Sequence, residues 1–171
     1  RHQAAALMDG RLRESQKELL AYRECHRGRR CFILGNGPSL RDTDLSRLRG
    51  EVTFGANRIY LLFPDLGFPT SYYVAVNTLV VEQCAAEIAA LDLHKFITWR
   101  ARRWIDKGRQ TLFLDTDYTE PANFTGDPTR RMFEGSTVTY TALQLAYYMG
   151  CDPVILIGVD HNFTSQGQPN V

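Results

Sequence analysis

The sequence predicts an α/β fold with three layers, a mostly parallel β-sheet and a helix at the N-terminal side. Short apolar runs of strand length, such as 31–34 and 153–158, alternate with helical or polar segments. Most of these runs are followed by glycine, asparagine or aspartate, which is typical of strands that lead into loops. This alternation favours parallel strands joined by right-handed crossovers, which is a Rossmann-like arrangement.

The elements follow one another in a regular order. Residues 4–24 are rich in helix formers and predict an N-terminal helix that is weakened near Gly10. The expected strands are residues 30–34, 51–54, 71–76, 95–99, 111–114 and 153–158. The last of these is the most hydrophobic, so we expect it at the centre of the sheet. Further helices or turns are expected over residues 42–48 (capped by Asp42 or Thr43), 58–63, 79–91 and 136–149.

The chain of 171 residues is long enough for one domain with a core of its own. We expect residues 1–28 to form an N-terminal helix or linker and residues 29–171 to form a nucleotide-binding domain. A polar loop follows the last strand directly, so we expect the domain to be truncated at its C-terminal end. The long polar stretch 115–134 is expected to be functional or mobile.

Composition excludes several classes of protein. The net charge of +1 does not favour nucleic acid as a partner, and no apolar run approaches the roughly 20 residues of a membrane span. The N-terminus lacks an apolar signal region, and the four cysteines lack C-x-x-C spacing, so we expect a cytoplasmic protein with reduced thiols. The arginines around positions 100–103 and 130–131 either meet an acidic substrate or form a solvated surface. Composition leaves the oligomeric state open, so an oligomer is possible.

Polar side chains follow several of the predicted strands. Asn36, Asn57, Asn77 and Asp160 each come directly after or close to the end of one strand. Because the carboxyl ends of parallel strands share one edge of the sheet, these side chains are expected to form a ligand site. The alternative is that asparagine merely tolerates the turns that follow strands.

A glycine-rich turn follows the first strand. It lacks the G-K-[ST] end of a P-loop and the third glycine of G-x-G-x-x-G. Gly35 and Gly37 would let the backbone approach a phosphate, and Ser39 would cap a helix or bind an oxygen. A simple tight turn is the alternative.

A second predicted anion site lies at the start of the helix 136–149. Ser136 and Thr137 follow Gly135 there, and their N–H groups and hydroxyls are expected to meet an anion, helped by the helix dipole. The alternative is that Ser136 is only the N-cap. After the last strand, Asp160 is a candidate for binding a sugar hydroxyl or a magnesium ion, or for orienting His161. His161 is a candidate for a general base, and a structural or solvated histidine is the alternative.

Taken together, these blocks resemble a known group of proteins. The order of 33–40, 54–57, Asn77, 135–137 and 157–160 is similar to that in bacterial sialyltransferases that use CMP-sialic acid. It also resembles the 6-hydroxymethylpterin diphosphokinase MptE-like domain family, many members of which lie in surface-polysaccharide or flagellin-glycosylation systems, and residues 138–163 look especially like this second group. The resemblance covers residues 30–165 and implies that the nucleotide or its sugar is bound by Asn36, Ser39, Asn57, Asn77, Ser136, Thr137 and Asp160. Together with Gly35 and Gly37 of the turn, these are the expected nucleotide-binding residues.

Three functions are compatible with this pattern. The first is a glycosyltransferase that transfers a CMP-linked acidic sugar to a glycan acceptor and requires no metal. The second is an ATP- and Mg²⁺-dependent diphosphotransferase acting on a pterin, with Asp160, Glu134 or Asp127 as magnesium ligands. The third is a non-catalytic nucleotide-binding domain of a larger glycan-assembly protein. The resemblance implies that a catalytic base would follow the last strand, and His161 does not match its place, so the base is unassigned.

Overall fold

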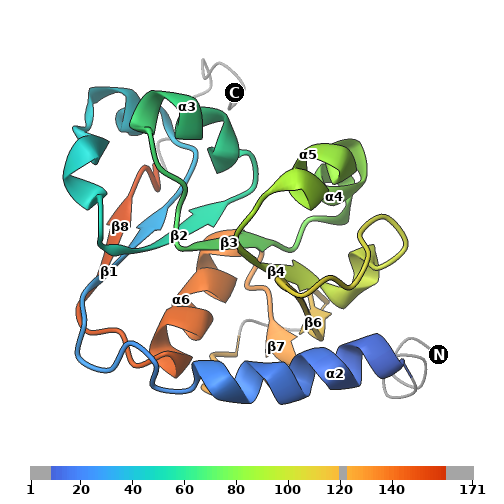
Figure 1. Ribbon diagram of the computed structural model, residues 1–171. Coiled ribbons are helices and arrows are strands. Elements are labelled where there is room, and N and C mark those ends of the chain that lie inside the picture. The colour runs from blue at the N-terminus through green and yellow to red at the C-terminus, as the bar shows by residue number, and fades with distance from the viewer. Residues whose placement is uncertain (1–8, 120–122, 161–171) are drawn as a thin grey trace.

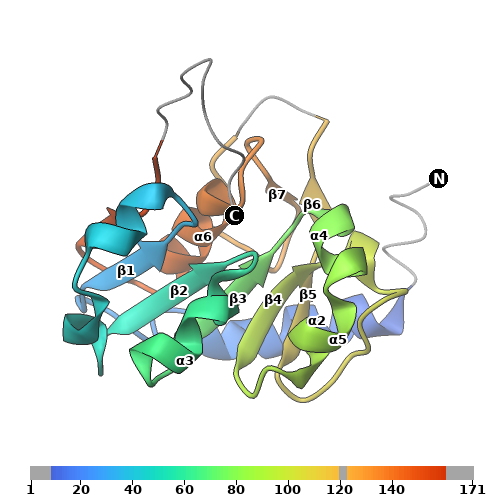
Figure 2. The ribbon, with the colours of Figure 1, turned by 90° about the horizontal axis from the view of Figure 1, so that it is seen from above.

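The computed structural model describes residues 9–119 and 123–160 of the chain. Six strands form one sheet in the order β5-β4-β3-β2-β1-β8, and every neighbouring pair is parallel (Figures 1 and 2). The strands are β1 (Cys31–Leu34), β2 (Val52–Ala56), β3 (Tyr72–Ala75), β4 (His94–Thr98), β5 (Thr111–Leu114) and β8 (Val154–Ile157). Two short strands, β6 (Thr116–Asp117) and β7 (Met132–Phe133), form a separate parallel pair. The predicted parallel α/β fold is confirmed.

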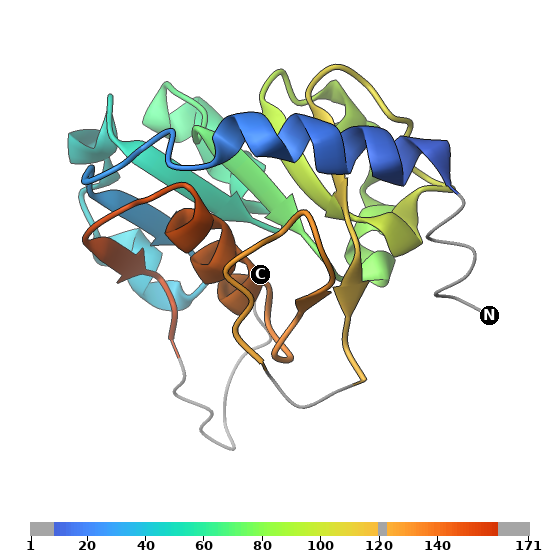
Figure 3. The ribbon, with the colours of Figure 1, turned by 90° about the horizontal axis from the view of Figure 1, so that it is seen from below.

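Helices cover both faces of the sheet. Figure 1 shows α3 (Phe63–Leu66), α4 (Thr78–Gln83) and α5 (Ala85–Ala90) on one side of it. The other side carries α2 (Gly10–Leu19) and α6 (Val138–Tyr148), as the view from below in Figure 3 shows. Five 3₁₀ segments complete the connections, η1 (Leu20–Tyr22), η2 (Pro38–Asp42), η3 (Leu45–Leu48), η4 (Ile59–Leu62) and η5 (Trp99–Ala101).

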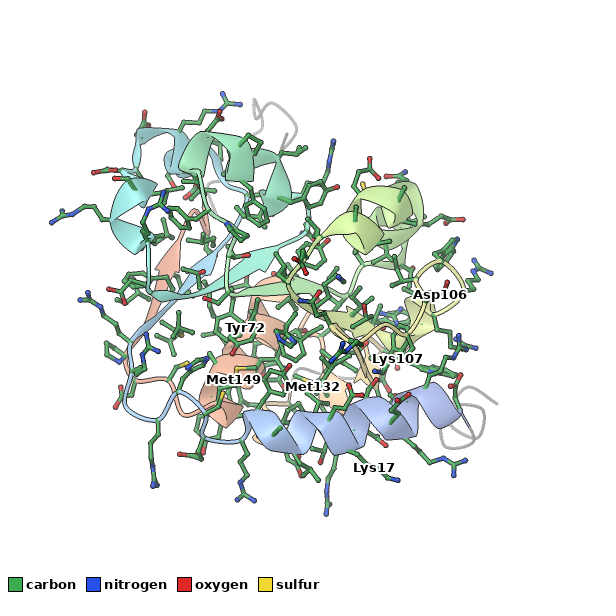
Figure 4. The ribbon with its side chains drawn as sticks, in the orientation of Figure 1. Lys17, Tyr72, Asp106, Lys107, Met132 and Met149 are labelled. Atoms are coloured by element: carbon green, nitrogen blue, oxygen red, sulfur yellow. The ribbon has the colours of Figure 1, made fainter. Side chains whose placement is uncertain are left out.

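Two apolar cores fill the spaces between these layers. Strand side chains alternate between the faces, so Ile33 faces one core and Leu34 the other. Tyr72, Met132 and Met149, which Figure 4 labels, belong to the core beside α6. The sheet is therefore covered on both sides, as expected for a parallel sheet.

Helix α2 protects the outer edge of β5. The buried hydroxyl of Ser15 accepts a hydrogen bond of 2.9 Å from the backbone N–H of Phe113 in β5. On the same helix, Glu18 accepts a hydrogen bond of 3.0 Å from the ammonium of Lys107, which Figure 4 labels. An edge strand would otherwise leave its N–H groups unpaired, so α2 closes this side of the sheet.

The position of the most hydrophobic strand was predicted wrongly. Strand β8 lies at the edge of the sheet, paired only with β1 among the described residues, and Leu156 is 46% exposed. The apolar sequence Val154–Ile157 is typical of a strand buried on both faces, but which strand stands next to which is decided by the crossovers.

Three expected helices differ in detail. Residues 42–48 form no α-helix, and η3 is capped by Asp44 instead of Asp42 or Thr43. The segment 79–91 is divided into α4 and α5 at Cys84, where φ is −116°. The N-cap of α6 is Thr137 and not Ser136. Among the described residues, no helix is long and apolar enough to cross a membrane.

Candidate functional site

The glycine-rich turn after β1 is hydrogen-bonded to the end of β8 and to the residue that follows it. Gly35 N–H donates to the Ile157 carbonyl at 2.9 Å, and Gly37 N–H donates to the Gly158 carbonyl at 2.8 Å. The Asn36 side chain donates to the Ala56 carbonyl at the end of β2, at 3.0 Å. The turn is therefore held in place by both strands that flank β1.

Ser39 and Asp160 form a close pair across the same two loops. The Asp160 carboxylate accepts from the Ser39 backbone N–H at 2.8 Å and from the Ser39 hydroxyl at 2.6 Å. The sequence placed both residues at one edge, and the structure brings them into contact. Asp160 thus fixes the turn after β1, whatever further role it has.

Close packing of the two loops explains the glycines of the turn. A Cβ atom on Gly35 would lie 2.9 Å from the Gly158 carbonyl carbon. A Cβ on Gly37 would lie 2.6 Å from the carboxyl carbon of Asp160 and 2.8 Å from the Gly158 oxygen. All three distances are shorter than non-bonded contact allows, so larger residues would push the loops apart.

A cavity of about 370 Å³ lies at the carboxyl ends of β2 and β3, beside the start of α6. It brings together four residues that the sequence predicted, Asn57, Asn77, Ser136 and Thr137. The other five predicted residues with described positions form the adjoining loop pair and do not line it, namely Gly35, Asn36, Gly37, Ser39 and Asp160. His161 lies outside the described residues.

Left-handed backbone conformations gather at this cavity. The φ angles of Asn57, Gly135 and Ser136 are +52°, +54° and +62°. Such conformations are uncommon outside glycine and are found preferentially at functional sites. In addition, the Asn57 side-chain oxygen is buried and has no hydrogen-bond partner among the described residues. A buried acceptor without a partner is costly, and a bound ligand with a donor group would satisfy it.

Two of the polar residues also act as helix caps. The Asn77 side chain accepts from the Leu79 N–H at 2.9 Å, and the Thr137 hydroxyl accepts from the Thr139 N–H at 3.3 Å. Both side chains therefore stabilise the start of a helix. Capping leaves lone pairs and the amide or hydroxyl donors of these side chains for a ligand. The 11-residue helix α6 adds the positive end of its dipole.

A charged network that the sequence analysis did not assemble completes the wall. The Arg100 guanidinium, which follows β4, donates to the Glu134 carboxylate and to the Val76 carbonyl at 3.3 Å. Glu134 also accepts from the Thr116 hydroxyl at 2.6 Å. Arg100 further lies 4.4 Å from the Tyr118 ring centroid. The sequence analysis named Arg100 as an arginine that meets an acidic substrate or solvent and Glu134 as a candidate magnesium ligand, but it did not predict that the two pair.

The family model for 6-hydroxymethylpterin diphosphokinase MptE-like proteins matches residues 6–166. The chain belongs to this MptE-like family. A comparison with curated proteins gives no match.

A solved structure shares the fold. The MAf glycosyltransferase from Magnetospirillum magneticum AMB-1 superposes with a TM-score of 0.53 at 18% sequence identity, over 88% of this chain. The chain spans only 28% of that protein's length. At this identity the similarity shows the fold, and a glycosyltransferase is one of the proteins that use it.

Proposed function

We propose that this MptE-like chain is the nucleotide-binding part of a glycosyltransferase that uses a CMP-linked acidic sugar, such as sialic acid, in surface-glycan assembly. One observation carries the proposal. The cavity at the carboxyl edge of the sheet collects Asn57, Asn77, Ser136 and Thr137 beside Arg100. Ligands of open α/β sheets bind at this edge, and a volume of about 370 Å³ lies in the range of small-ligand pockets.

The chemistry of the walls supports a donor that carries a phosphate. The N-terminus of α6 supplies positive potential where a leaving phosphate would gain charge. Arg100 lies in the same wall, where Glu134 balances its charge and its guanidinium offers N–H donors. The unpartnered oxygen of Asn57 would accept from a ribose or sugar hydroxyl. The turn 35–39 would form the rim on the side of β1.

In the proposed reaction the oxygen of an acceptor hydroxyl forms a bond to the anomeric carbon of the sugar. The bond between that carbon and the phosphate oxygen breaks, and its electron pair leaves with CMP. The hydroxyl proton passes to a general base, which we leave unassigned. The part of the chain described here contributes by orienting the donor and stabilising the leaving group.

A diphosphotransferase using ATP and Mg²⁺ remains the second candidate because the family is named for that activity. The three candidate carboxylates do not fit a magnesium site as they stand. Asp160 accepts from Ser39, Glu134 is paired with Arg100, and Asp127 accepts from Thr129 and lies 3.5 Å from Arg130. Among the described residues, no group of three potential metal ligands occurs. We derive no step through this metal.

Calorimetric titration distinguishes these functions. We expect CMP to bind without Mg²⁺ and ATP to bind more weakly with or without it. The variant Asn57→Gly removes the side chain and keeps the left-handed backbone, so CMP affinity should fall about three- to tenfold through the lost hydrogen bond. The matched control Asn123→Gly changes an exposed asparagine away from the cavity and should bind CMP as the wild type does.

Two results would contradict the proposal. The first is no binding of any cytidine nucleotide, and the second is Mg²⁺-dependent binding of ATP alone, which would favour the diphosphotransferase. Binding of CMP without transfer in the full-length protein would favour a non-catalytic nucleotide-binding domain.

A further inference from the structure

A second cavity, of about 790 Å³, adjoins the first. Thr78, Arg100 and Tyr118 line both cavities, so ligands in the two would meet at these residues. The second cavity is lined by five arginines, Arg11, Arg100, Arg102, Arg103 and Arg131. Asp117 is the one carboxylate among the described residues that line it.

Aromatic rings hold two of these arginines in place. The Arg102 guanidinium lies 3.5 Å from the Trp99 ring centroid, and the Arg103 guanidinium lies 3.9 Å from that of Trp104. A guanidinium stacked on a ring keeps its N–H donors directed outward in its plane. Less conformational entropy is then lost when an anion binds.

Carboxylates behind the cavity wall orient two others. Arg11 pairs with Asp9 at 3.0 Å, and Arg131 pairs with Asp115 at 3.3 Å. The hydrogen bond from Arg11 lowers the pKa of Asp9 to about 2, so this carboxylate is ionised at neutral pH. These pairs fix the positions of the guanidinium groups and leave part of each exposed, with 43% of the Arg11 side chain accessible.

The five arginines of the cavity outnumber by one the four carboxylates that pair with them, Asp9, Asp115, Asp117 and Glu134. Burial lowers the pKa of Arg102, and neighbouring Arg11 and Arg103 lower it further against the attraction of Asp9. The protein thus keeps a partly buried arginine beside two like charges. A bound anion would relieve this repulsion.

We propose that the arginine-lined cavity is an acceptor subsite that binds the carboxylate groups of an acidic saccharide. The inference rests on the proposed function, because it places the acceptor next to the donor across Arg100 and Tyr118. Bidentate pairing of guanidinium groups with carboxylates supplies the affinity, and the volume of about 790 Å³ exceeds that of the donor cavity, as several sugar units require.

The test compares two oligosaccharides by calorimetric titration in the presence of CMP. The acidic probe is a hyaluronan tetrasaccharide, and the neutral probe is chitotetraose, which shares the N-acetylglucosamine units without carboxylates. We expect the acidic probe to bind and the neutral one to bind far more weakly. Raising the salt concentration should weaken the binding of the acidic probe, because salt screens the attraction between exposed charges.

The variant Arg103→Gln tests the assignment with little risk to the fold, because Arg103 is exposed. Its affinity for the acidic tetrasaccharide should fall about tenfold, since a charge-assisted contact is lost. Its affinity for CMP should not change. The matched control is Arg47→Gln, an exposed arginine in η3 that lines neither cavity, and it should leave both affinities unchanged.

Each outcome decides between the two proposals. Equal binding of the acidic and neutral probes, or full binding of the acidic probe by Arg103→Gln, overturns the acceptor subsite and leaves the donor site untouched. If Arg103→Gln lowers the affinity for CMP-sialic acid but not for the acidic probe, the cavity binds the donor and the inference is wrong. Loss of CMP binding with Arg103-dependent binding of the acidic probe would contradict the proposed function alone.

Discussion

Replacement of Gly37 by alanine tests the interpretation that the glycine turn is required by loop packing. The added Cβ would lie 2.6 Å from the carboxyl carbon of Asp160 and 2.8 Å from the Gly158 oxygen. Both neighbours belong to the segment after β8, so that segment must move. Its movement would strain or break the two hydrogen bonds from Ser39 to Asp160.

The expected loss of stability follows from these contacts. Overpacking of this kind costs about 1–3 kcal/mol, and the reduced entropy of the unfolded alanine chain offsets about 0.4–1 kcal/mol of that. The two hydrogen bonds are exposed and add little. A net loss of about 1 kcal/mol should lower the melting temperature by roughly 2–4 °C in a chain of this size.

The assay is thermal unfolding followed by circular dichroism, with Gly10→Ala as the matched control. A Cβ on Gly10 meets no atom within 4 Å, and this residue begins α2. The control should therefore melt at or slightly above the wild-type temperature, because alanine favours helix. A Gly37→Ala protein with the same melting temperature as the wild type would refute the packing argument. If that protein also lost CMP binding, the glycine would serve ligand approach instead.

Two further predictions concern the fold. Ser15→Ala should lower the free energy of unfolding by about 1–3 kcal/mol, because it leaves the buried Phe113 N–H without its acceptor. Urea denaturation measures this loss, and an unchanged free energy would contradict the role of α2 at the sheet edge. Burial and the nearby charge of Arg29 lower the pKa of His26 below its usual value of 6.5. The unfolded chain therefore binds more protons there, so the stability contributed by His26 is complete above pH 6.5 and is lost as the pH falls below it. When the pH is lowered from above 6.5 to below it, the melting temperature should fall less for His26→Gln than for the wild type. Equal falls would contradict this role of His26.

Much of the fold was predictable because its signals are local. Apolar runs bounded by turn residues identified the six strands of the main sheet, and the alternation with helices predicted parallel pairing. The edge position of β8 was not predictable, because an apolar run reports the preference of its own side chains and not which strand lies beside it. The division of 79–91 at Cys84 likewise depends on how α4 and α5 pack on the sheet.

The sequence by itself determined which short polar residues end the strands, and hence that Asn57, Asn77 and the start of α6 share one edge. Only the tertiary structure decided their partners. Ser39 and Asp160 are 121 positions apart, and Arg100 and Glu134 are 34 apart. The physical reason is that strand and turn preferences act between neighbours in the chain, whereas hydrogen bonds, ion pairs and cavities depend on which segments the folded sheet brings into contact.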